Sequence, residues 1–337
     1  MNLLLNEDNF KLVNISRKMP TIYYGISGPP KAGGQYVNHQ HVQALREAGF
    51  NAKLFYWPQT NVAEKIDTQL PVQGFTKNFV FDREDVIVVP EAWRKPIHTF
   101  SQMQVRKILH CQNPYYIFQS VESIHQFEDM GYEQSITCSH YTGRYMRAMG
   151  YGGEIHIVRP PLGKEFLNQE SISKKLQIAF MPRKRAIESV HVKGLFKSIY
   201  PQYAQVPWIS IQNVSRRECA SFMRESAVFA SFSDLEGLGL PPLEAMASGC
   251  IIVGFDGGGG EEYRSASNGL WVREGDHFGY ARALAQAIQI TQSKKDHFEI
   301  VNAGFETVKQ YTSENFNIRI IKIWKEILGD QISKYMG

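Results

Sequence analysis

The segment 228–255, VFASFSDLEGLGLPPLEAMASGCIIVGF, constrains the fold of this chain more than any other. It opens with the apolar run 228–232 and closes with the apolar run 250–255, and each has the length of a buried strand. A glycine-rich loop and a short helical stretch lie between the two runs. A strand, a loop, a helix and a second strand predict two parallel strands, with the loop at the carboxyl-end edge of an α/β sheet.

The loop and the helix of this segment have the composition of an anion-binding site. Gly237 and Gly239 form a Gly-x-Gly loop, and Pro241 and Pro242 open the helix, because proline is tolerated at the first helical position. Gly249 is expected to end the helix as a left-handed C-cap. The free N–H groups and the positive dipole end of such a helix start attract phosphate.

Two acidic residues lie beside this predicted phosphate site. Glu236 is in the loop and Glu244 is in the first helical turn, so both can face one ligand at the helix start. A carboxylate beside a phosphate site is useful when the ligand also has hydroxyl groups, as a ribose does. The alternative is that Glu244 only stabilises its helix through the dipole and that Glu236 is a solvated loop residue. The glycine loop and the flanking strands favour a ligand with phosphate, ribose and sugar.

The residues 236–249, EGLGLPPLEAMASG, resemble the signature of retaining nucleotide-sugar glycosyltransferases of the GT-B fold, the glycogen-synthase-like group called glycosyl transferases group one. The resemblance implies two Rossmann-like doubly wound domains that face each other across a cleft. It also implies a last helix that crosses back to the first domain. Shorter matches to the same family occur at Gly33-Gly34, at Ser139, at the Pro-Pro-Leu corner 160–162 and at 268–272 (NGLWV).

The alternation of predicted elements along the chain gives the same α/β fold class. Apolar runs alternate with helical periodicity, and a Pro-Pro-Leu-Gly corner at 160–163 interrupts the pattern. We expect an N-terminal acceptor domain over 1–165, a C-terminal donor domain over 166–311 and a terminal helix, 312–337, that returns to the first domain. The predicted strands outside the signature are 21–24, 52–56, 86–89, 107–111, 135–138, 155–158, 176–180 and 208–211, and the predicted helices are 36–48, 140–149, 276–292, 295–310 and 312–334.

Composition excludes several other classes of protein. No apolar run approaches the roughly 20 residues of a membrane span, and the start MNLLLNEDNF lacks the basic region of a secretory signal. The 4 cysteines include no C-x-x-C pair, which argues against a zinc site and fits a reducing cytosol. The net charge of +4 does not call for nucleic acid as a partner. We expect a cytoplasmic protein whose mild basicity allows peripheral contact with the inner face of a membrane.

A diphosphate leaving group gains negative charge as the bond to the sugar breaks, and preorganised cations stabilise that charge. Arg183 and Lys184 directly follow the predicted strand 176–180 and are the catalytic candidates for this role. Arg183 suits bidentate contact with phosphate, and Lys184 suits a point charge. The resemblance implies an arginine and a lysine at this place with wider spacing, so Arg185 and Lys193 stay open for the lysine's role. A solvated basic turn is the alternative.

The resemblance also implies roles for other residues. Glu244 would bind the ribose hydroxyls, and Glu236 would bind the sugar hydroxyls as part of the catalytic set. A first-domain histidine often approaches the donor sugar in this family, so His110 is a further catalytic candidate. A core histidine is the alternative interpretation of His110, and Gln112 and Asn113 are nearby polar alternatives for the role. The expected donor-binding residues are Glu236, Gly237, Leu238, Gly239, Leu240, Glu244, Gly33 and Gly34.

We therefore expect a retaining glycosyltransferase that moves a sugar from a nucleoside-diphosphate sugar to a glycan or lipid-linked acceptor, in polysaccharide biosynthesis. The sequence has no Asp-x-Asp motif of the metal-dependent sugar transferases, so neither a metal ion nor a cofactor is expected. Glu91 is a candidate for acceptor contact or for acid–base chemistry. Two alternatives stay open: a catalytically weak GT-B protein that binds a nucleotide sugar or a glycan, and a nucleotide-sugar epimerase. The donor base, the sugar and the acceptor are undetermined.

Overall fold

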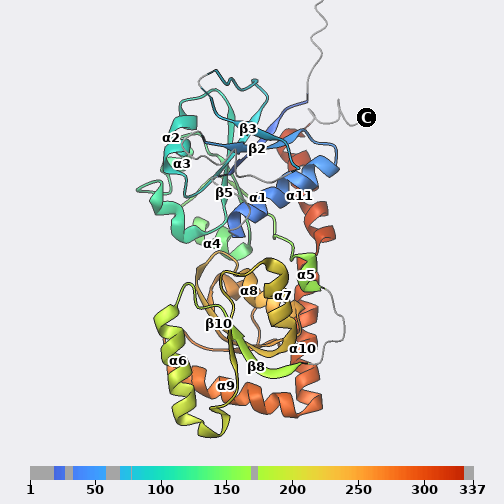
Figure 1. Cartoon of the computed structure of the whole chain (residues 1–337). Helices are drawn as coiled ribbons and strands as arrows, with labels where there is room; N and C mark the ends of the chain where they lie inside the picture. Colours follow the sequence, from blue (N-terminus) through green and yellow to red (C-terminus); the bar gives the residue numbers. More distant parts are fainter. Residues whose placement is uncertain (1–18, 27–32, 58–68, 77, 168–173, 330–337) are drawn as a thin grey trace, which may run out of the picture.

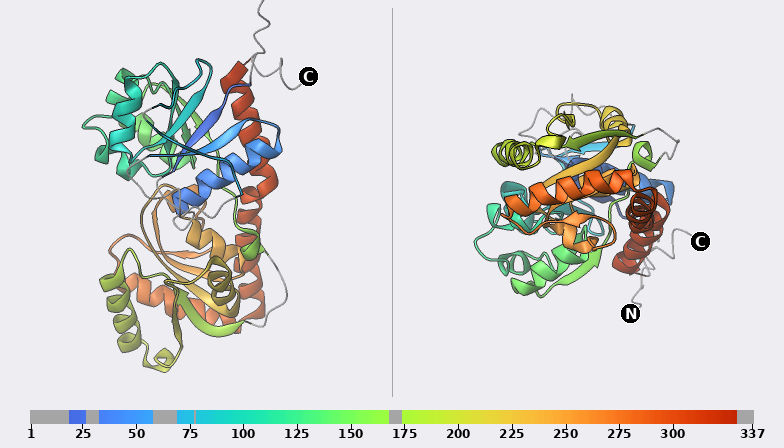
Figure 2. Two further views of the ribbon diagram at one scale, coloured as in Figure 1. Left: turned by 45° about the horizontal axis from the view of Figure 1, so that its top comes forward. Right: turned by 90° about the horizontal axis from the view of Figure 1, so that it is seen from below.

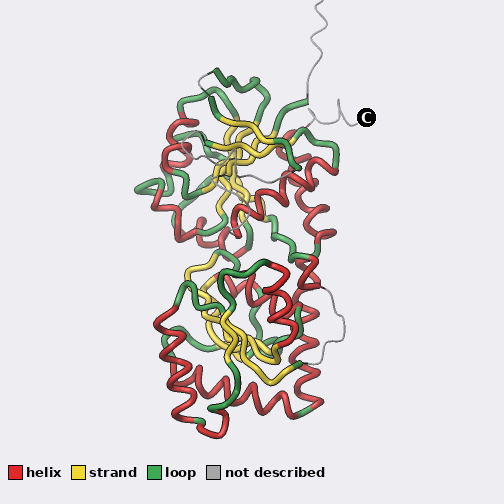
Figure 3. The backbone as a smooth tube through the Cα atoms, in the orientation of Figure 1, coloured by secondary structure: helices red, strands yellow, loops and turns green. Residues whose placement is uncertain are grey.

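The computed structural model describes residues 19–26, 33–57, 69–76, 78–167 and 174–329. Within them the chain forms two parallel β-sheets, each in its own lobe, and the lobes are stacked along the long axis of the molecule (Figure 1). Strands lie inside each lobe and helices cover them (Figure 3). This is the predicted α/β class with two doubly wound units. The segment MNLLLNEDNF lies outside the described residues.

The first lobe contains seven strands in the order β3-β2-β1-β4-β5-β6-β7, and all neighbouring strands are parallel. The strand order reverses between β1 and β4, so their carboxyl ends flank a crevice. The elements of this lobe are β1 (Ile22–Ile26), α1 (Gly33–Glu47), β2 (Ala52–Tyr56), β3 (Val72–Gly74), β4 (Val86–Pro90), α2 (Arg94–Ser101), β5 (Arg106–Cys111), η2 (Pro114–Gln119), α3 (Gln126–Asp129), β6 (Gln134–Thr137), α4 (His140–Ala148) and β7 (Glu154–Ile157).

The second lobe contains five parallel strands in the order β12-β11-β10-β8-β9. The strand order reverses between β8 and β10, which makes their carboxyl ends the switch point of this sheet. The elements are α5 (Lys164–Leu167), β8 (Lys175–Phe180), α6 (Ala186–Ile199), η3 (Pro201–Tyr203), β9 (Trp208–Ser210), α7 (Arg216–Glu225), β10 (Ser226–Glu236), α8 (Leu240–Ala247), β11 (Ile251–Gly258), η4 (Gly259–Glu262), β12 (Leu270–Trp271), α9 (His277–Gln292), α10 (Lys294–Val308), η5 (Lys309–Tyr311) and α11 (Ser313–Leu328).

The signature segment folds as its sequence predicts. β10, α8 and β11 follow one another, and β10 pairs with β11 in parallel. The helix α8 starts at Leu240 with proline in its first turn. Its C-cap is Ser248, and the left-handed residue is the expected Gly249, with a φ of +75°, one position further on. β10 is longer than the predicted run and continues to Glu236, which brings that carboxylate to the carboxyl edge of the sheet. The helices α2, α3, α6 and α7 were not delimited from the sequence.

The last helix joins the second lobe to the first. α11 follows the elements of the second lobe but runs along the first, beside α1 (Figure 2). Its buried face includes Ile320 and Trp324, which pack in one cluster with α1 and β1. The indole N–H of Trp324 donates to the hydroxyl of Tyr24 at 3.0 Å. The predicted domain division at 165/166 falls inside α5 and stays a prediction.

The two faces of the first sheet are covered by different side chains. α1 and α11 cover one face, and their aliphatic residues meet β1 and β4. Aromatic rings fill the other face, where Tyr23 and Phe55 pack edge to face with a centroid separation of 5.5 Å. Buried apolar side chains therefore cover most of both faces of the described sheet. Of the helices that the structure describes, none has the length and apolar character that crossing a bilayer requires.

Candidate active site

The candidate site lies at the switch point of the second sheet. β8 and β10 are neighbours there, and their carboxyl ends point toward the first lobe. Lys184 lies in the turn after β8, and Glu236 is the last residue of β10. The amino-terminal end of α8 begins four residues later in the same region. The fold thus places a cation, a carboxylate and a helix start at one sheet edge, as expected for an anion-binding crevice.

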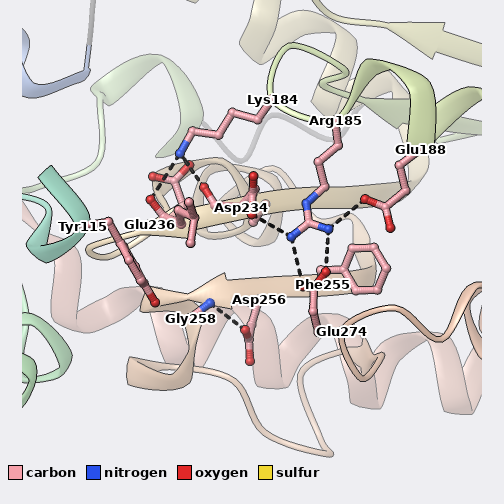
Figure 4. Close-up of polar contacts among 12 residues, drawn as sticks. Tyr115, Lys184, Arg185, Glu188, Asp234, Glu236, Phe255, Asp256, Gly258 and Glu274 are labelled. Atoms are coloured by element: carbon pink, nitrogen blue, oxygen red, sulfur yellow. Dashed lines mark hydrogen bonds and ion pairs between the residues drawn. The ribbon is translucent and has the colours of Figure 1, made fainter.

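Lys184 and Glu236 contact each other directly. The ammonium Nζ of Lys184 lies 2.8 Å from Oε1 of Glu236 and donates to the carbonyl oxygen of Asp234 at 2.6 Å (Figure 4). Both side chains are partly exposed, so a ligand can reach the pair. Of the two cations expected after β8, Lys184 is the one that meets the signature carboxylate.

The other cations of this region make different contacts. Arg185 forms ion pairs with Asp234 at 2.8 Å and with Glu188 at 2.7 Å, and its guanidinium lies over the ring of Phe255 (Figure 4). The ammonium of Lys193 lies 5.8 Å from the ring centroid of Trp208. These contacts give Arg185 and Lys193 structural partners away from Glu236.

Arg183 is exposed in the turn between Lys184 and the end of β8. It makes no hydrogen bond or ion pair with another residue of the described ranges. Its proposed contact with phosphate therefore stays a prediction, and its long side chain is at the correct sheet edge for it.

The sequence predicts Glu244 in the first turn of α8, but the helix starts at Leu240, so Glu244 begins its second turn, and it is only 5% exposed. Arg216, the first residue of α7, donates to its Oε1 at 3.1 Å and to Oε1 of Glu165 at 2.6 Å. The guanidinium of Arg216 also lies 4.3 Å from the ring centroid of Tyr36 on α1. One arginine therefore links the second signature acid to α5 and to the first lobe.

Burial raises the pKa of the Glu244 carboxyl to about 7, although the neighbouring Arg216 acts to lower it. The charge of Glu165 adds a smaller increase. A carboxyl group that titrates near neutral pH can gain or lose a proton when a bound ligand changes the charges and the solvent around it. Glu244 is therefore sensitive to whatever occupies the start of α8.

The glycine loop is shaped by close approach to the first lobe. A Cβ at Gly237 would clash with the carbonyl oxygen of Gln112, so a side chain there would push the lobes apart. Gly239 has a φ of +80°, which favours glycine, and its carbonyl oxygen accepts a hydrogen bond from the hydroxyl of Tyr263 at 2.7 Å. Leu238 between them is buried, and Leu240 begins α8.

The first glycine loop reaches the same place from the other lobe. α1 begins at Gly33, and the amide of Gln112 donates to the carbonyl oxygen of Gly34 at 3.1 Å. Gln112 follows β5 and contacts Gly237 through its own carbonyl group. Gly34, Gln112 and Gly237 are therefore neighbours across the lobe boundary, while Gly33 is exposed with open space around it.

His110 is placed in the core rather than at an open surface. Its side chain is 1% exposed, and its ring lies 5.0 Å from that of His41 and 5.9 Å from that of Tyr24. Burial lowers the pKa of His110 to about 3, so the ring is neutral. It approaches the site only through Gln112, whose amide lies 3.5 Å from Nδ1. Contact with a donor sugar stays a prediction for this residue.

Glu91 has both carboxylate oxygens occupied. Oε1 accepts from the backbone N–H of Asn113 at 3.0 Å, and Oε2 accepts from that of Gln112 at 3.2 Å. Burial raises its pKa to about 7. The carboxylate therefore supports the loop after β5, and acceptor contact or acid–base chemistry at Glu91 stays a prediction.

Some residues of the site have no distinct signal in the sequence. Arg216 belongs to the stretch SRRE, in which Ser215 and Glu218 form a capping box, so the sequence indicates a helix start there but no partner for the arginine. Asn113 is a polar alternative to His110 in the sequence and precedes a proline, which indicates a turn, but no sequence signal indicates a contact with the other lobe. Among the described side chains, no group of three or more His, Cys, Asp or Glu is placed to hold a metal ion.

Solved structures with the same architecture identify the fold of the protein. A glycosyltransferase from Rickettsia africae superposes with a TM-score of 0.69 at 12% identity, over 93% of this chain and 99% of its own. HepE of Anabaena, solved in complex with UDP-glucose, gives a TM-score of 0.65 at 13% identity, over 91% of this chain and 99% of its own. The two facing lobes therefore have the GT-B fold.

Sequence comparisons place the chain more narrowly. The model of the family described as glycosyl transferases group 1 matches residues 205–302, which include the signature. The alpha-1,6-glucosyltransferase of Actinobacillus pleuropneumoniae serotype 7 is 32% identical over 315 residues, which are 91% of this chain and 94% of that protein. The chain belongs to the glycosyl transferases group 1 family and is a glycosyltransferase.

Proposed function

We propose that the protein is a retaining glucosyltransferase that takes glucose from a nucleoside-diphosphate glucose and passes it to a glycan or lipid-linked acceptor. The observation that carries the proposal is the contact of Lys184 with Glu236 at the switch point, next to the start of α8. A phosphate-binding cation and a carboxylate for hydroxyl groups are thus adjacent, as a sugar bonded to a diphosphate requires.

The relatives support the choice of donor. The relative from Actinobacillus pleuropneumoniae is named an alpha-1,6-glucosyltransferase, which favours glucose as the transferred sugar. HepE of Anabaena was solved with UDP-glucose, which favours UDP as the nucleotide. The pair of Lys184 and Glu236 suits such a donor, since it offers one group to the diphosphate and one to the sugar.

The diphosphate, the ribose and the glucose of the donor each have a proposed counterpart in the site. The N–H groups at Gly239 and Leu240 and the cations Arg183 and Lys184 would hold the diphosphate and stabilise its growing charge as the glycosidic bond breaks. Glu244 would accept hydrogen bonds from the ribose hydroxyls. Glu236 would accept hydrogen bonds from the glucose hydroxyls. These are the roles that the family resemblance implies, and they fit the positions of the side chains.

Retention would follow if the acceptor attacks on the face from which the phosphate departs. In this proposal the departing phosphate assists the acceptor, and no carboxylate serves as a nucleophile. An α-linked donor would then give an α-linked product. We also propose that no divalent metal ion and no cofactor take part, because Lys184 supplies the positive charge that a metal would otherwise bring to the diphosphate.

The experiment that tests the donor assignment is thermal unfolding of the full-length protein with a panel of nucleoside diphosphates and their sugars, with and without EDTA. A donor at about 100 times its Kd should add roughly 2.7 kcal/mol to the free energy of unfolding. A selective shift with UDP-glucose that EDTA leaves unchanged is the expected result. A shift that disappears with EDTA would contradict the metal-free site.

Turnover separates the proposed activity from the alternatives. A protein that only binds a nucleotide sugar or a glycan would show the thermal shift without releasing UDP. An epimerase would change the sugar in the absence of any acceptor. Cytoplasmic location and peripheral contact with a membrane stay predictions of the sequence.

A further inference from the structure

Glu236 lies between two backbone carbonyl groups that are held by side chains of the other lobe. The amide Nδ2 of Asn113 donates to the carbonyl oxygen of Leu235 at 2.8 Å. The hydroxyl groups of Ser139 and Thr142 donate to the carbonyl oxygen of Gly237 at 2.6 and 3.0 Å. The residues before and after the carboxylate are therefore both anchored to the first lobe.

These three donors are buried. Asn113 is 7% exposed, and Ser139 and Thr142 are 0% exposed. Water cannot replace them without opening the lobe boundary. Loss of the Asn113 amide leaves the carbonyl oxygen of Leu235 with only the long contact to Nζ of Lys184 at 3.4 Å, and loss of the Thr142 hydroxyl leaves that of Gly237 with Ser139 alone. Their contacts are therefore part of what fixes the backbone around Glu236.

The backbone here needs such support. Leu235 has a φ of +47°, a conformation that leucine rarely adopts. The pairing of β10 with β11 also shifts register between Ser233 and Glu236, so the strand does not continue its regular ladder to the end. A strained residue persists only where the surroundings hold it, and Asn113 supplies a contact to its carbonyl group from the first lobe.

We propose that Asn113 and Thr142 are positioning residues that hold the segment 235–237. By holding this segment they keep Glu236 beside Lys184. The sugar end of the donor site is therefore complete only while the two lobes are in contact. The role of Glu236 toward the sugar rests on the proposed function, whereas the holding of the segment does not. Affinity for the sugar part of a donor then depends on the contacts that Asn113 and Thr142 make with this segment, and affinity for the nucleotide part does not.

Two isosteric substitutions remove these donors, and Asn113→Asp also adds a carboxylate, a change that its control below shares. Asn113→Asp keeps an oxygen that accepts from the N–H of Tyr115, as Asn113 does at 3.0 Å, but has no N–H to give to Leu235. Thr142→Val keeps the shape of the side chain and removes the hydroxyl group. Thr142→Ser retains the hydroxyl and serves as the rescue variant.

Each substitution has a matched control in the same lobe. Asn51→Asp makes the same chemical change at the opposite edge of the first sheet, where Nδ2 donates to Oγ1 of Thr21 at 2.8 Å. Ser135→Ala removes a buried hydroxyl on β6 whose partner is the sulfur of Met146 at 3.9 Å. Neither residue contacts the segment 235–237.

The experiment combines amide hydrogen exchange of the unliganded full-length protein with the dissociation constants of UDP-glucose and UDP. We expect Asn113→Asp and Thr142→Val to speed exchange in the peptide around 233–240 by about fivefold, the factor for one lost hydrogen bond. Thr142→Ser should restore slow exchange. Asn113→Asp should weaken UDP-glucose by at least about fivefold and UDP by less than about twofold.

The outcomes separate the two claims. If amide exchange in Asn113→Asp and Thr142→Val is as slow as in the controls, then the first lobe does not hold the segment 235–237. If exchange is faster but the affinities for UDP-glucose and for UDP fall by the same factor, then these residues do not position the sugar end of the site. If the wild-type protein binds no nucleotide sugar, the proposed function fails, and the exchange data still decide whether the first lobe holds the segment.

Discussion

The ammonium of Lys184 lies 2.8 Å from a carboxylate oxygen of Glu236. The lysine comes from the turn after β8 and the glutamate from the end of β10, so the pair bridges the two strands at which the sheet order reverses. Each charge is neutralised by the other in the unliganded protein. A donor with a diphosphate and a sugar can bind Lys184 through phosphate and Glu236 through hydroxyl groups, so it offers a new partner to each.

Loss of the Lys184 ammonium should lower turnover strongly. Lys184→Met should reduce kcat by about 10²- to 10³-fold, the range for one preorganised group that stabilises transition-state charge. Lys193→Met is the matched control, because Lys193 contacts the ring of Trp208 and not Glu236. Steady-state release of UDP from UDP-glucose checks the pair. Equal turnover in the two variants would show that Lys184 does not serve the leaving group.

Donor affinity should depend on pH through Glu244. Its pKa is about 7 in the folded chain, against an ordinary value of 4.5, so the folded protein holds a proton that the unfolded chain releases between these values. The stabilisation from this proton is complete below about pH 4.5 and is lost as the pH rises through about 7. Ribose hydroxyls instead need the ionised carboxylate, so affinity for UDP-glucose should rise as the pH passes through about 7 and then level off.

Titration of UDP-glucose across this pH range checks the dependence, because its diphosphate diester has no group that titrates there. Glu244→Gln should bind more weakly at high pH and show a flat profile. Glu91 also has a pKa of about 7, so Glu91→Gln is the necessary comparison. A sloping profile that survives in Glu244→Gln and disappears in Glu91→Gln would assign the titration to the loop after β5.

Arg216 should stabilise both the protein and the bound donor. Arg216→Gln leaves Glu244 and Glu165 without their shared cation, so the free energy of unfolding should fall by about 1.5–3 kcal/mol and UDP-glucose should bind about tenfold more weakly at neutral pH. Arg217→Gln removes an exposed neighbour on the same helix and should change neither quantity. Chemical denaturation and calorimetric titration measure the two effects. Equal results for both arginines would contradict the account.

The contact of α11 with the first lobe should be a main contributor to stability. Trp324 is fully buried against Tyr24, so Trp324→Ala should cost about 3–5 kcal/mol. Ile318 on the same helix is 61% exposed, and Ile318→Ala should stay within about 0.5 kcal/mol of the wild-type value. Denaturant unfolding compares the two. A small loss in Trp324→Ala would mean that α11 is not anchored to the first lobe.

The signature unit could be predicted because its information is local. Two apolar runs, a Gly-x-Gly loop, the pair Pro241-Pro242 and Gly249 each specify one step of the strand-loop-helix-strand order, and all agree with the observed β10, α8 and β11. By contrast, α6 carries Ile187 and Val190 on its exposed surface, so its apolar residues do not mark a single buried face. Its bounds could not be read in the same way.

The contacts of the site could not be predicted, because they join distant parts of the chain. Lys184 and Arg185 are adjacent in sequence. Only the fold shows that Lys184 pairs with Glu236 and that Arg185 pairs with Glu274. His110 stands at the end of a strand, where exposure is expected. The ring of His110 packs against Tyr24, which also contacts His41 on α1 and Trp324 on α11. These two helices cover that face of the sheet, so His110 is buried.

The most direct measurement of the central claim follows UDP-glucose by NMR with the wild-type protein and Lys184→Met, in EDTA, against a panel of oligosaccharide and lipid-linked acceptors. We predict that the wild-type protein releases UDP and forms a new α-glucosidic linkage. In Lys184→Met both the release of UDP and the formation of the linkage should be much slower. A β-linked product, a reaction that stops in EDTA, or equal rates for the two proteins would contradict this prediction.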